Sequence, residues 1–181
     1  MIKKSVIFID RDGVINKEMP EGEYVKRWNQ FHFLPGVFKT LKTLKENGFL
    51  AIVVTNQRCV AKGVISEEDL KEIHNKMTTQ IKQHGGNIDA IYFCPHDISN
   101  NCNCRKPKPG MILEAINDLK EQGVQIDFKN SYMVGNSETD ILAGKNSGLI
   151  TIKIGGYSTL SDLNEKTFLE AVRCILKRSS I

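Results

Sequence analysis

The chain has 181 residues, of which 40% are apolar and 25% are charged, and it carries a net charge of +4. This composition is ordinary for a globular protein, and single cores grow to roughly 250 residues before chains split, so we expect one domain over residues 1–181. The lysines are scattered, so the mild positive charge does not indicate a nucleic-acid partner, although it suits a small anionic substrate.

The first apolar run is short, since it covers residues 5–9 and ends at Asp10. A secretory signal needs about 7–15 apolar residues and a membrane span about 20. We therefore expect a cytoplasmic protein without a membrane partner, in a reducing compartment where the five cysteines are thiols or metal ligands. No long apolar stripe is left over once the core is assigned, which favours a monomer.

Short apolar, β-branched runs alternate with helical patterns along the chain. The runs are typical of strands buried on both faces, and they lie at residues 5–9, 50–54, 88–93, 131–134 and 150–154. Helical spacing, with start and stop residues, predicts helices at about 35–47, 66–84, 109–121, 137–148 and 161–177. This order predicts an α/β fold in which a parallel sheet carries helices on both faces.

Polar residues that suit catalysis follow several of the predicted strands. Asp10 and Asp12 follow the first strand, Thr55 and Asn56 the second, and Asn136 and Asp140 the fourth. In parallel sheets, ligands bind outside the carboxyl ends of the strands. We therefore expect these side chains to meet at one edge of the sheet.

Two carboxylates stand two positions apart in the segment FIDRDGVIN, residues 8–16. An aspartate such as Asp10 can act as a nucleophile and form an aspartyl phosphate. Asp12 can protonate the leaving oxygen and later activate water, and Mg²⁺ can screen the repulsion between carboxylate and phosphate. A turn capped by two aspartates is the alternative interpretation of this segment.

Three further segments carry groups that suit phosphate binding. In VTNQ, residues 54–57, a hydroxyl and side-chain amides can donate hydrogen bonds, although such residues also close turns. In RKPKPG, residues 105–110, Lys106 can hold negative charge and Arg105 can grip phosphate, and an exposed basic loop is the alternative. In VGNSETD, residues 134–140, oxygen ligands follow a strand, whereas a helix cap at Asn136 or Ser137 would also explain the pattern.

An irregular polar stretch contains the pattern C-x-H-x5-C-x-C, formed by Cys94, His96, Cys102 and Cys104. Three thiols and one imidazole match a closed, tetrahedral zinc site, which leaves no open position for catalysis. We therefore expect a structural zinc that pins the loop at about residues 94–104 and positions Arg105 and Lys106, with chance clustering of thiols as the alternative. We expect Cys59 and Cys174 to be partly buried thiols, and His32, His74 and His84 to occupy surface or helix positions.

In the order DxD, TNQ, RKPKPG and GNSETD, the four motifs resemble those of the haloacid dehalogenase superfamily, from about residue 5 to residue 154. The resemblance implies a Rossmann-like phosphatase with Asp10 as nucleophile, Asp12 as general acid and base, phosphoryl contacts from Thr55 and charge stabilisation by Lys106. It implies magnesium held by Asp10, the backbone carbonyl of Asp12 and the fourth motif, that is, Asn136 and Asp140. Only about 40 residues separate the first two motifs, so the chain resembles capless members, whose loops hold the substrate.

One residue departs from the superfamily pattern, which usually has aspartate where this chain has Asn136. Asparagine offers a neutral oxygen, so we expect weaker magnesium affinity, which Asp140 compensates directly or through water. A binding protein on an impaired phosphatase scaffold is therefore an alternative function. The intact pair of Asp10 and Asp12 argues against it.

The zinc loop resembles that of the subgroup containing heptose 1,7-bisphosphate and histidinol-phosphate phosphatases, and the segments around Tyr24, after TNQ and in RKPKPGM favour the heptose type. We therefore expect a small phosphorylated sugar, a heptose 1,7-bisphosphate that loses its 7-phosphate, with histidinol phosphate or another small phosphomonoester as the alternative. The expected substrate contacts are Tyr24, Asn56, Gln57, Arg58, Arg105, Lys106 and Ser137. A 3′-phosphatase for nucleic-acid ends is a further alternative, but the sequence lacks the basic stripe that it needs.

Overall fold

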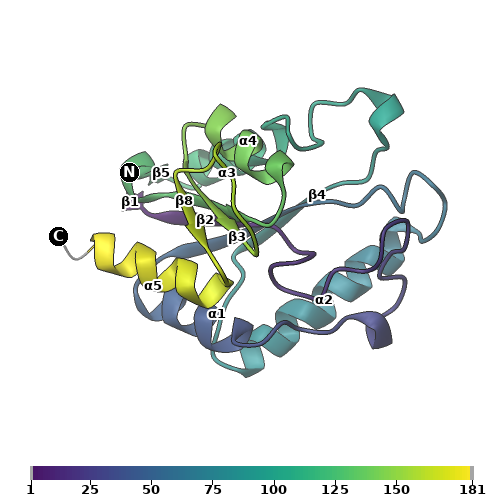
Figure 1. The fold of residues 1–181 in the computed structure, drawn as a ribbon, viewed down its shortest axis with the longest axis horizontal. Coiled ribbons are helices and arrows are strands. Elements are labelled where there is room, and N and C mark those ends of the chain that lie inside the picture. Colours follow the sequence, from purple (N-terminus) through teal and green to yellow (C-terminus); the bar gives the residue numbers. More distant parts are fainter. Residues whose placement is uncertain (1, 180–181) are drawn as a thin grey trace.

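A parallel sheet forms the centre of the computed structural model, which describes residues 2–179 (Figure 1). Six strands follow the order β4-β3-β2-β6-β7-β8. Their bounds are Val6–Ile9 for β2, Leu50–Asn56 for β3, Ala90–Cys94 for β4, Tyr132–Gly135 for β6, Ile150–Ile154 for β7 and Leu163–Glu165 for β8. A separate parallel pair joins β1 (Ile2–Lys4) to β5 (Val124–Ile126). The predicted α/β fold with a parallel sheet is confirmed.

Helices cover both faces of this sheet, as the alternation of strands and helices predicts (Figure 1). On one face lie α1 (Val37–Glu46), α2 (Glu67–Gln83) and α5 (Phe168–Ser179), and on the other lie α3 (Gly110–Glu121) and α4 (Glu138–Asn146). Three short 3-10 helices, Trp28–Gln30, Ile98–Asn100 and Phe128–Asn130, lie in the connections. None of the helices described is long and apolar enough to cross a membrane.

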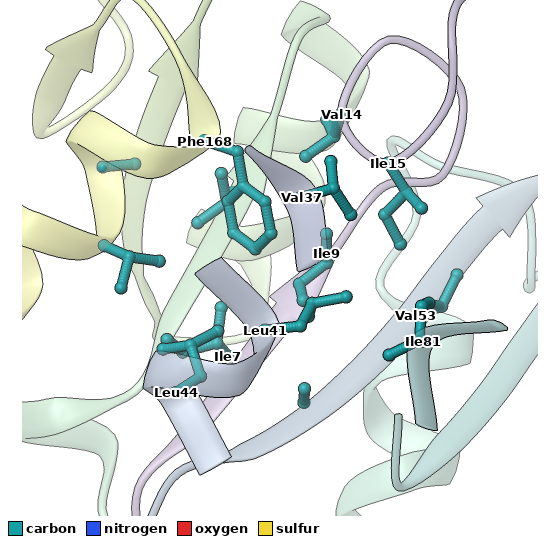
Figure 2. Packing of buried hydrophobic residues seen from close by; sticks show 14 of the residues in the cluster. Ile7, Ile9, Val14, Ile15, Val37, Leu41, Leu44, Val53, Ile81 and Phe168 are labelled. Atoms are coloured by element: carbon teal, nitrogen blue, oxygen red, sulfur yellow. The ribbon is translucent and has the colours of Figure 1, made fainter. Parts of the chain in front are cut away.

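The central strand β2 is buried on both faces. Alternate side chains of a strand point in opposite directions, so its residues enter the cores on both sides of the sheet. Ile7 and Ile9 pack into the core under α1, α2 and α5, while Val6 and Phe8 pack into the core under α3 and α4. Figure 2 shows Ile7 and Ile9 beside Leu41 of α1. This burial fixes the direction of β2, and therefore the place where residue 10 leaves the sheet.

Two helices begin with the same reciprocal cap. At α2, Ser66 Oγ accepts a hydrogen bond from the Asp69 amide at 3.0 Å, and the Asp69 carboxylate accepts one from the Ser66 amide at 3.1 Å. At α4, Ser137 and Asp140 form the same capping box. The cap at Ser66 confirms the predicted helix start. At the fourth motif, the structure selects Ser137 over Asn136 as the capping residue.

The helix predicted over residues 161–177 is wrong in its first part. Residues Leu163–Glu165 form strand β8, which pairs with β7, and α5 begins only at Phe168. The cause is a tertiary contact, because the Asp162 carboxylate accepts hydrogen bonds from the Thr151 amide at 2.8 Å and the Thr151 hydroxyl at 2.7 Å. These bonds hold the chain beside β7, where it pairs as an edge strand instead of coiling.

Candidate active site

A cavity of about 410 Å³ opens at the carboxyl ends of β2, β3 and β6. The chain turns away from β2 and β6 on opposite sides of the sheet, and such a switch point is where parallel sheets bind ligands. The predicted catalytic, magnesium and substrate residues all line it: Asp10, Asp12, Tyr24, Thr55, Asn56, Gln57, Arg58, Arg105, Lys106, Asn136, Ser137 and Asp140. The expected convergence of the four motifs is therefore present.

A buried lysine joins two aspartates at the floor of the cavity. Lys106 Nζ lies 2.7 Å from Asp10 Oδ1, 2.6 Å from Asp140 Oδ1 and 2.8 Å from the Val54 carbonyl. Burial disfavours the charge of Lys106, but Asp10 and Asp140 outweigh it and raise its pKa above the ordinary lysine value. Lys106 therefore carries a fixed positive charge against Asp10.

Asp10 and Asp140 bring two negative charges to one lysine. Burial, and then the charge of Asp140, raise the pKa of Asp10 to about 7 in the metal-free protein. The surplus of negative charge and the hard oxygen donors fit a divalent cation such as Mg²⁺. The side-chain amide of Asn136 lies directly against Gly13 of the first motif. The contact is so close that a Cβ added at Gly13, whose φ is +84°, would overlap with the Asn136 side chain.

Asp140 has protein partners on both oxygens. Oδ1 pairs with Lys106, while Oδ2 accepts hydrogen bonds from the Ser137 amide at 3.0 Å and the Ser137 hydroxyl at 2.7 Å. Lys106 and Ser137 therefore fix the orientation of the Asp140 carboxylate beside Asp10. The two arrangements expected for Asp140, direct ligation and compensation through water, stay predictions.

The carboxylate of Asp12 is held by three donors. Arg11 Nη2 lies 3.0 Å from each oxygen, Asn16 Nδ2 lies 2.9 Å from Oδ1, and Gln57 Nε2 lies 2.8 Å from Oδ2. Burial opposes ionisation of Asp12, but the Arg11 charge and these hydrogen bonds outweigh it and lower the pKa of Asp12. The sequence analysis did not assign Arg11 or Asn16 to the site.

His74 was expected at a surface or helix position, and it lies on α2 but is 5% exposed. Its Nε2 lies 3.0 Å from Arg11 Nη1. Burial, with the Arg11 charge adding to it, lowers the pKa of His74 to about 3, so the ring is neutral. The signal was in the sequence, because residue 74 falls on the apolar stripe of Leu70, Met77 and Ile81.

The side-chain amides of the second motif mainly form hydrogen bonds with residues of the first and third motifs. Asn56 Oδ1 accepts from the Lys106 amide at 3.0 Å, and Asn56 Nδ2 donates to the Lys106 carbonyl at 3.1 Å. Gln57 Nε2 donates to Thr55 Oγ1 at 2.9 Å in addition to Asp12. Asn56 and Gln57, which we expected to contact substrate, line the cavity but direct these atoms at protein groups.

The open rim of the cavity combines basic and aromatic side chains with an acidic loop. Arg58 Nε donates to the Tyr24 hydroxyl at 3.0 Å, and Arg105 Nη1 donates to the His96 carbonyl at 3.3 Å. The acidic loop, residues 18–24, is mostly exposed and contains three glutamates. One of them, Glu18, accepts a hydrogen bond from Asn136 Nδ2 at 3.0 Å, a contact that the sequence analysis missed.

The predicted zinc ligands gather in one cluster. The ligand atoms of Cys94, His96, Cys102 and Cys104 lie within 4.8 Å of one another. Cys94 and Cys102 Sγ are 3.5 Å apart, and Cys102 and Cys104 Sγ are 3.4 Å apart. Zn–S bonds of about 2.3 Å in a tetrahedron place sulfurs about 3.8 Å apart, so the cluster is compatible with zinc.

The cysteines and histidines outside this cluster differ in how deeply they are buried. Cys59 was expected to be partly buried, but it is fully buried, because it packs with Ile65 and Leu70 in a small apolar cluster. Cys174 is of intermediate exposure, as expected, and His32 and His84 are exposed.

Residues 5–157 match the family described as polynucleotide kinase 3 phosphatase. Over 161 residues, the chain is 38% identical to the D-glycero-beta-D-manno-heptose-1,7-bisphosphate 7-phosphatase of Pasteurella multocida, covering 84% of this chain and 83% of that one. Over 158 residues, it is 36% identical to the alpha-type 7-phosphatase of Mycobacterium tuberculosis, with 84% and 80% covered. The crystal structure of D,D-heptose 1,7-bisphosphate phosphatase from B. bronchiseptica, complexed with magnesium and phosphate, superposes with a TM-score of 0.83 at 27% identity, covering 96% of this chain and 99% of that one.

Proposed function

Because the chain belongs to the phosphatases of the haloacid dehalogenase superfamily, in the family described as polynucleotide kinase 3 phosphatase and of the heptose 1,7-bisphosphate 7-phosphatase type, we propose that it removes the 7-phosphate of a heptose 1,7-bisphosphate. The observation that carries the proposal is the contact of 2.7 Å between Lys106 Nζ and Asp10 Oδ1, beside an Asp12 carboxylate held in place by three donors. This arrangement supplies a nucleophile, a charge stabiliser and a proton carrier within one cavity.

The reaction proceeds in two displacements at phosphorus. In the first, an oxygen of Asp10 forms a bond to phosphorus, the ester P–O bond breaks, and Asp12 gives its proton to the leaving sugar oxygen. In the second, water attacks the aspartyl phosphate while Asp12 takes its proton, and the bond between Asp10 and phosphorus breaks. Lys106 and the Thr55 hydroxyl hold the negative charge of the phosphoryl oxygens. The products are the heptose 1-phosphate and inorganic phosphate.

Magnesium is the metal that this oxygen-rich site fits, with Asp10, the Asp12 backbone carbonyl and Asn136 as the residues that would hold it and Asp140 contributing directly or through water. When bound, it neutralises phosphate charge near Asp10. The cysteine and histidine cluster would hold a structural zinc. The last zinc ligand, Cys104, is separated from Lys106 by one residue, so the metal would fix the loop that presents this lysine.

The charged side chains at the rim of the cavity support a bisphosphate as the substrate. Arg58 and Arg105 offer cationic groups for a second phosphate, and Tyr24 lies beside Arg58. A nucleic-acid 3′-phosphatase is the competing function suggested by the description of the matching family. The acidic loop argues against it, because the phosphates of a strand running over this exposed loop would face its three glutamates, whereas a small bisphosphate can stay beside Arg58 and Arg105.

The test is phosphate release by purified protein with Mg²⁺, using both anomers of heptose 1,7-bisphosphate, histidinol phosphate and a 3′-phosphorylated oligonucleotide. We expect fast turnover of the bisphosphate and none with Asp10→Asn. Turnover of histidinol phosphate or the oligonucleotide alone would keep the mechanism and overturn the substrate. Folded, metal-loaded protein that hydrolyses none of them would support a binding function instead.

A further inference from the structure

Arg11 is a buried cation between the two aspartates of the first motif. Arg11 is 1% exposed, and its guanidinium contacts Asp12 on one side and His74 on the other. Its Cζ also lies 5.9 Å from the centre of the Phe31 ring. Nη1 and Nη2 have these partners, whereas the buried Nε has no hydrogen-bond partner among the described residues, so His74 and Asp12 fix where the guanidinium points.

The acceptor on the helix side is His74. An arginine N–H can only donate, so Nε2 of His74 must accept, which places the ring proton on Nδ1. The ring is held in place by the buried stripe of α2 and by an edge contact with Phe93 at 5.8 Å between ring centres. His74 therefore offers a fixed, neutral acceptor to Arg11 Nη1, although it does not reach the cavity itself.

Arg11 passes this restraint on to the carboxylate of Asp12. Nη2 lies 3.0 Å from both Asp12 oxygens, so it still holds one oxygen when the other carries a proton. Asn16 and Gln57 each reach a single oxygen. Arg11 is thus the donor that can orient Asp12 in both protonation states, as a group that gives and then takes a proton requires.

We propose that His74 is a positioning residue for Asp12, acting through Arg11, in the transfer of a proton to the leaving oxygen. The inference rests on the proposed role of Asp12 in the phosphatase reaction. Loss of the acceptor leaves a second buried Arg11 N–H group, that of Nη1, unpaired beside Nε, and the guanidinium then rotates to recover a partner. Asp12 loses its fixed orientation, and a misplacement of about 1 Å is enough to slow a reaction about 100-fold.

The test compares leaving groups, because a good leaving group needs no proton from Asp12. We would measure kcat/KM, which includes the step that expels the leaving group, for substituted phenyl phosphates and for an alkyl phosphate. His74→Leu should lose roughly 10- to 100-fold with the alkyl phosphate and less than about 3-fold with 4-nitrophenyl phosphate. His74→Gln, whose side-chain oxygen can accept in place of Nε2, should recover most of the loss. Met77→Ala, one turn further along α2, should lower stability without changing the dependence on the leaving group.

Each outcome has one meaning. If His74→Leu slows all substrates equally, or none, the positioning role is wrong. If Asp12→Asn itself shows no dependence on the leaving group, the proposed role of Asp12 fails, which is a different result. If His74→Leu does not fold, nitrogen-15 NMR of the native protein decides, with the His74 signal assigned from His74→Gln. A protonated Nε2 would overturn the inference, and an unprotonated Nε2 with the proton on Nδ1 would support it.

Discussion

The two sides of the cavity differ in how firmly their side chains are held. On the side of the strand ends, Asp10, Lys106 and Asp140 are between 1% and 8% exposed, and both aspartates contact Lys106. On the opposite side, the acidic loop is mostly exposed, and a turn bond of 2.9 Å from the Glu23 amide to the Pro20 carbonyl lies within it. From this difference we infer that the strand ends carry the chemistry and that the acidic loop and its neighbours select the substrate.

The variant with the largest expected effect removes the proposed nucleophile, Asp10, from the buried side of the cavity. Asp10→Asn should keep the contact with Lys106 through its amide oxygen, and it should lower kcat by at least about 10⁴-fold, since no aspartyl phosphate can form. Phosphate release and the melting temperature should be measured on the same sample. Residual activity within about 100-fold of the native enzyme would mean that Asp10 is not the nucleophile.

Removing the buried cation should affect both stability and activity. Lys106→Met leaves Asp10 and Asp140 facing each other without a positive charge, and we expect a loss of about 3–5 kcal/mol in unfolding free energy and about 10³-fold in kcat. Urea denaturation measures the first and phosphate release the second. Adding Asp140→Asn should restore part of the stability but not the activity. Equal recovery of both would show that Lys106 serves only the fold.

Loss of a ligand from the cysteine and histidine cluster should disturb the loop that presents Lys106 to the cavity. Cys104→Ser removes one of four ligands, so we expect weak metal retention and a fall of roughly 10- to 100-fold in kcat/KM, because the loop before Lys106 loosens. Metal content by atomic absorption and activity should fall together. Cys174→Ser is the matched control, since this thiol lies outside the cluster. Native activity in zinc-free protein would contradict the positioning role of the loop.

Changes at the rim should alter substrate binding more than the chemical step. Arg58→Gln removes a cation beside Tyr24, and we expect KM for the bisphosphate to rise about 5- to 20-fold while kcat stays within about 3-fold. A sugar monophosphate should lose much less. Lys42→Gln on α1, an exposed cation far from the cavity, is the control for net charge. A fall in kcat with unchanged KM would place Arg58 on the chemical side of the comparison.

The smallest expected effect concerns the metal. Asn136→Asp restores a negative ligand, and we expect magnesium affinity to rise about 10-fold by calorimetry, since an ionised oxygen attracts Mg²⁺ more strongly than an amide oxygen. Glu18 accepts a hydrogen bond from Asn136, so it should repel an aspartate there and limit the gain. Glu18→Gln in the same background should enlarge it. Equal affinities of the native and Asn136→Asp proteins would reject the weakened metal site.

Residues next to the ends of apolar strands were predictable, and those that depend on distant partners were not. Asp10, Thr55 and Asn136 follow strands whose burial is evident in the sequence, so their convergence follows from the parallel sheet. Arg11 is different, because its buried side chain pairs with His74, 63 residues away, and no local pattern in the sequence shows that contact. The fixed Lys106 depends likewise on Asn56, 50 residues away.

The boundary of the last helix illustrates the same limit in the fold. Local spacing favours a helix from residue 161, yet Asp162 contacts Thr151 and residues 163–165 pair with β7. Hydrogen bonds to an adjacent strand outweigh local helix propensity, which is worth less than about 1 kcal/mol per residue.

The sequence by itself determined five strands of the parallel sheet, helices on both of its faces, the four motifs and the metal-binding pattern, because each depends on local periodicity or on the chemistry of neighbouring residues. Only the tertiary structure decided which donors hold Asp12, that Asp140 pairs with Lys106, and that Glu18 reaches Asn136. Those contacts join residues far apart in the chain. Their geometry is set by the packing of strands and helices, in which a shift of one residue would point a side chain to the other face.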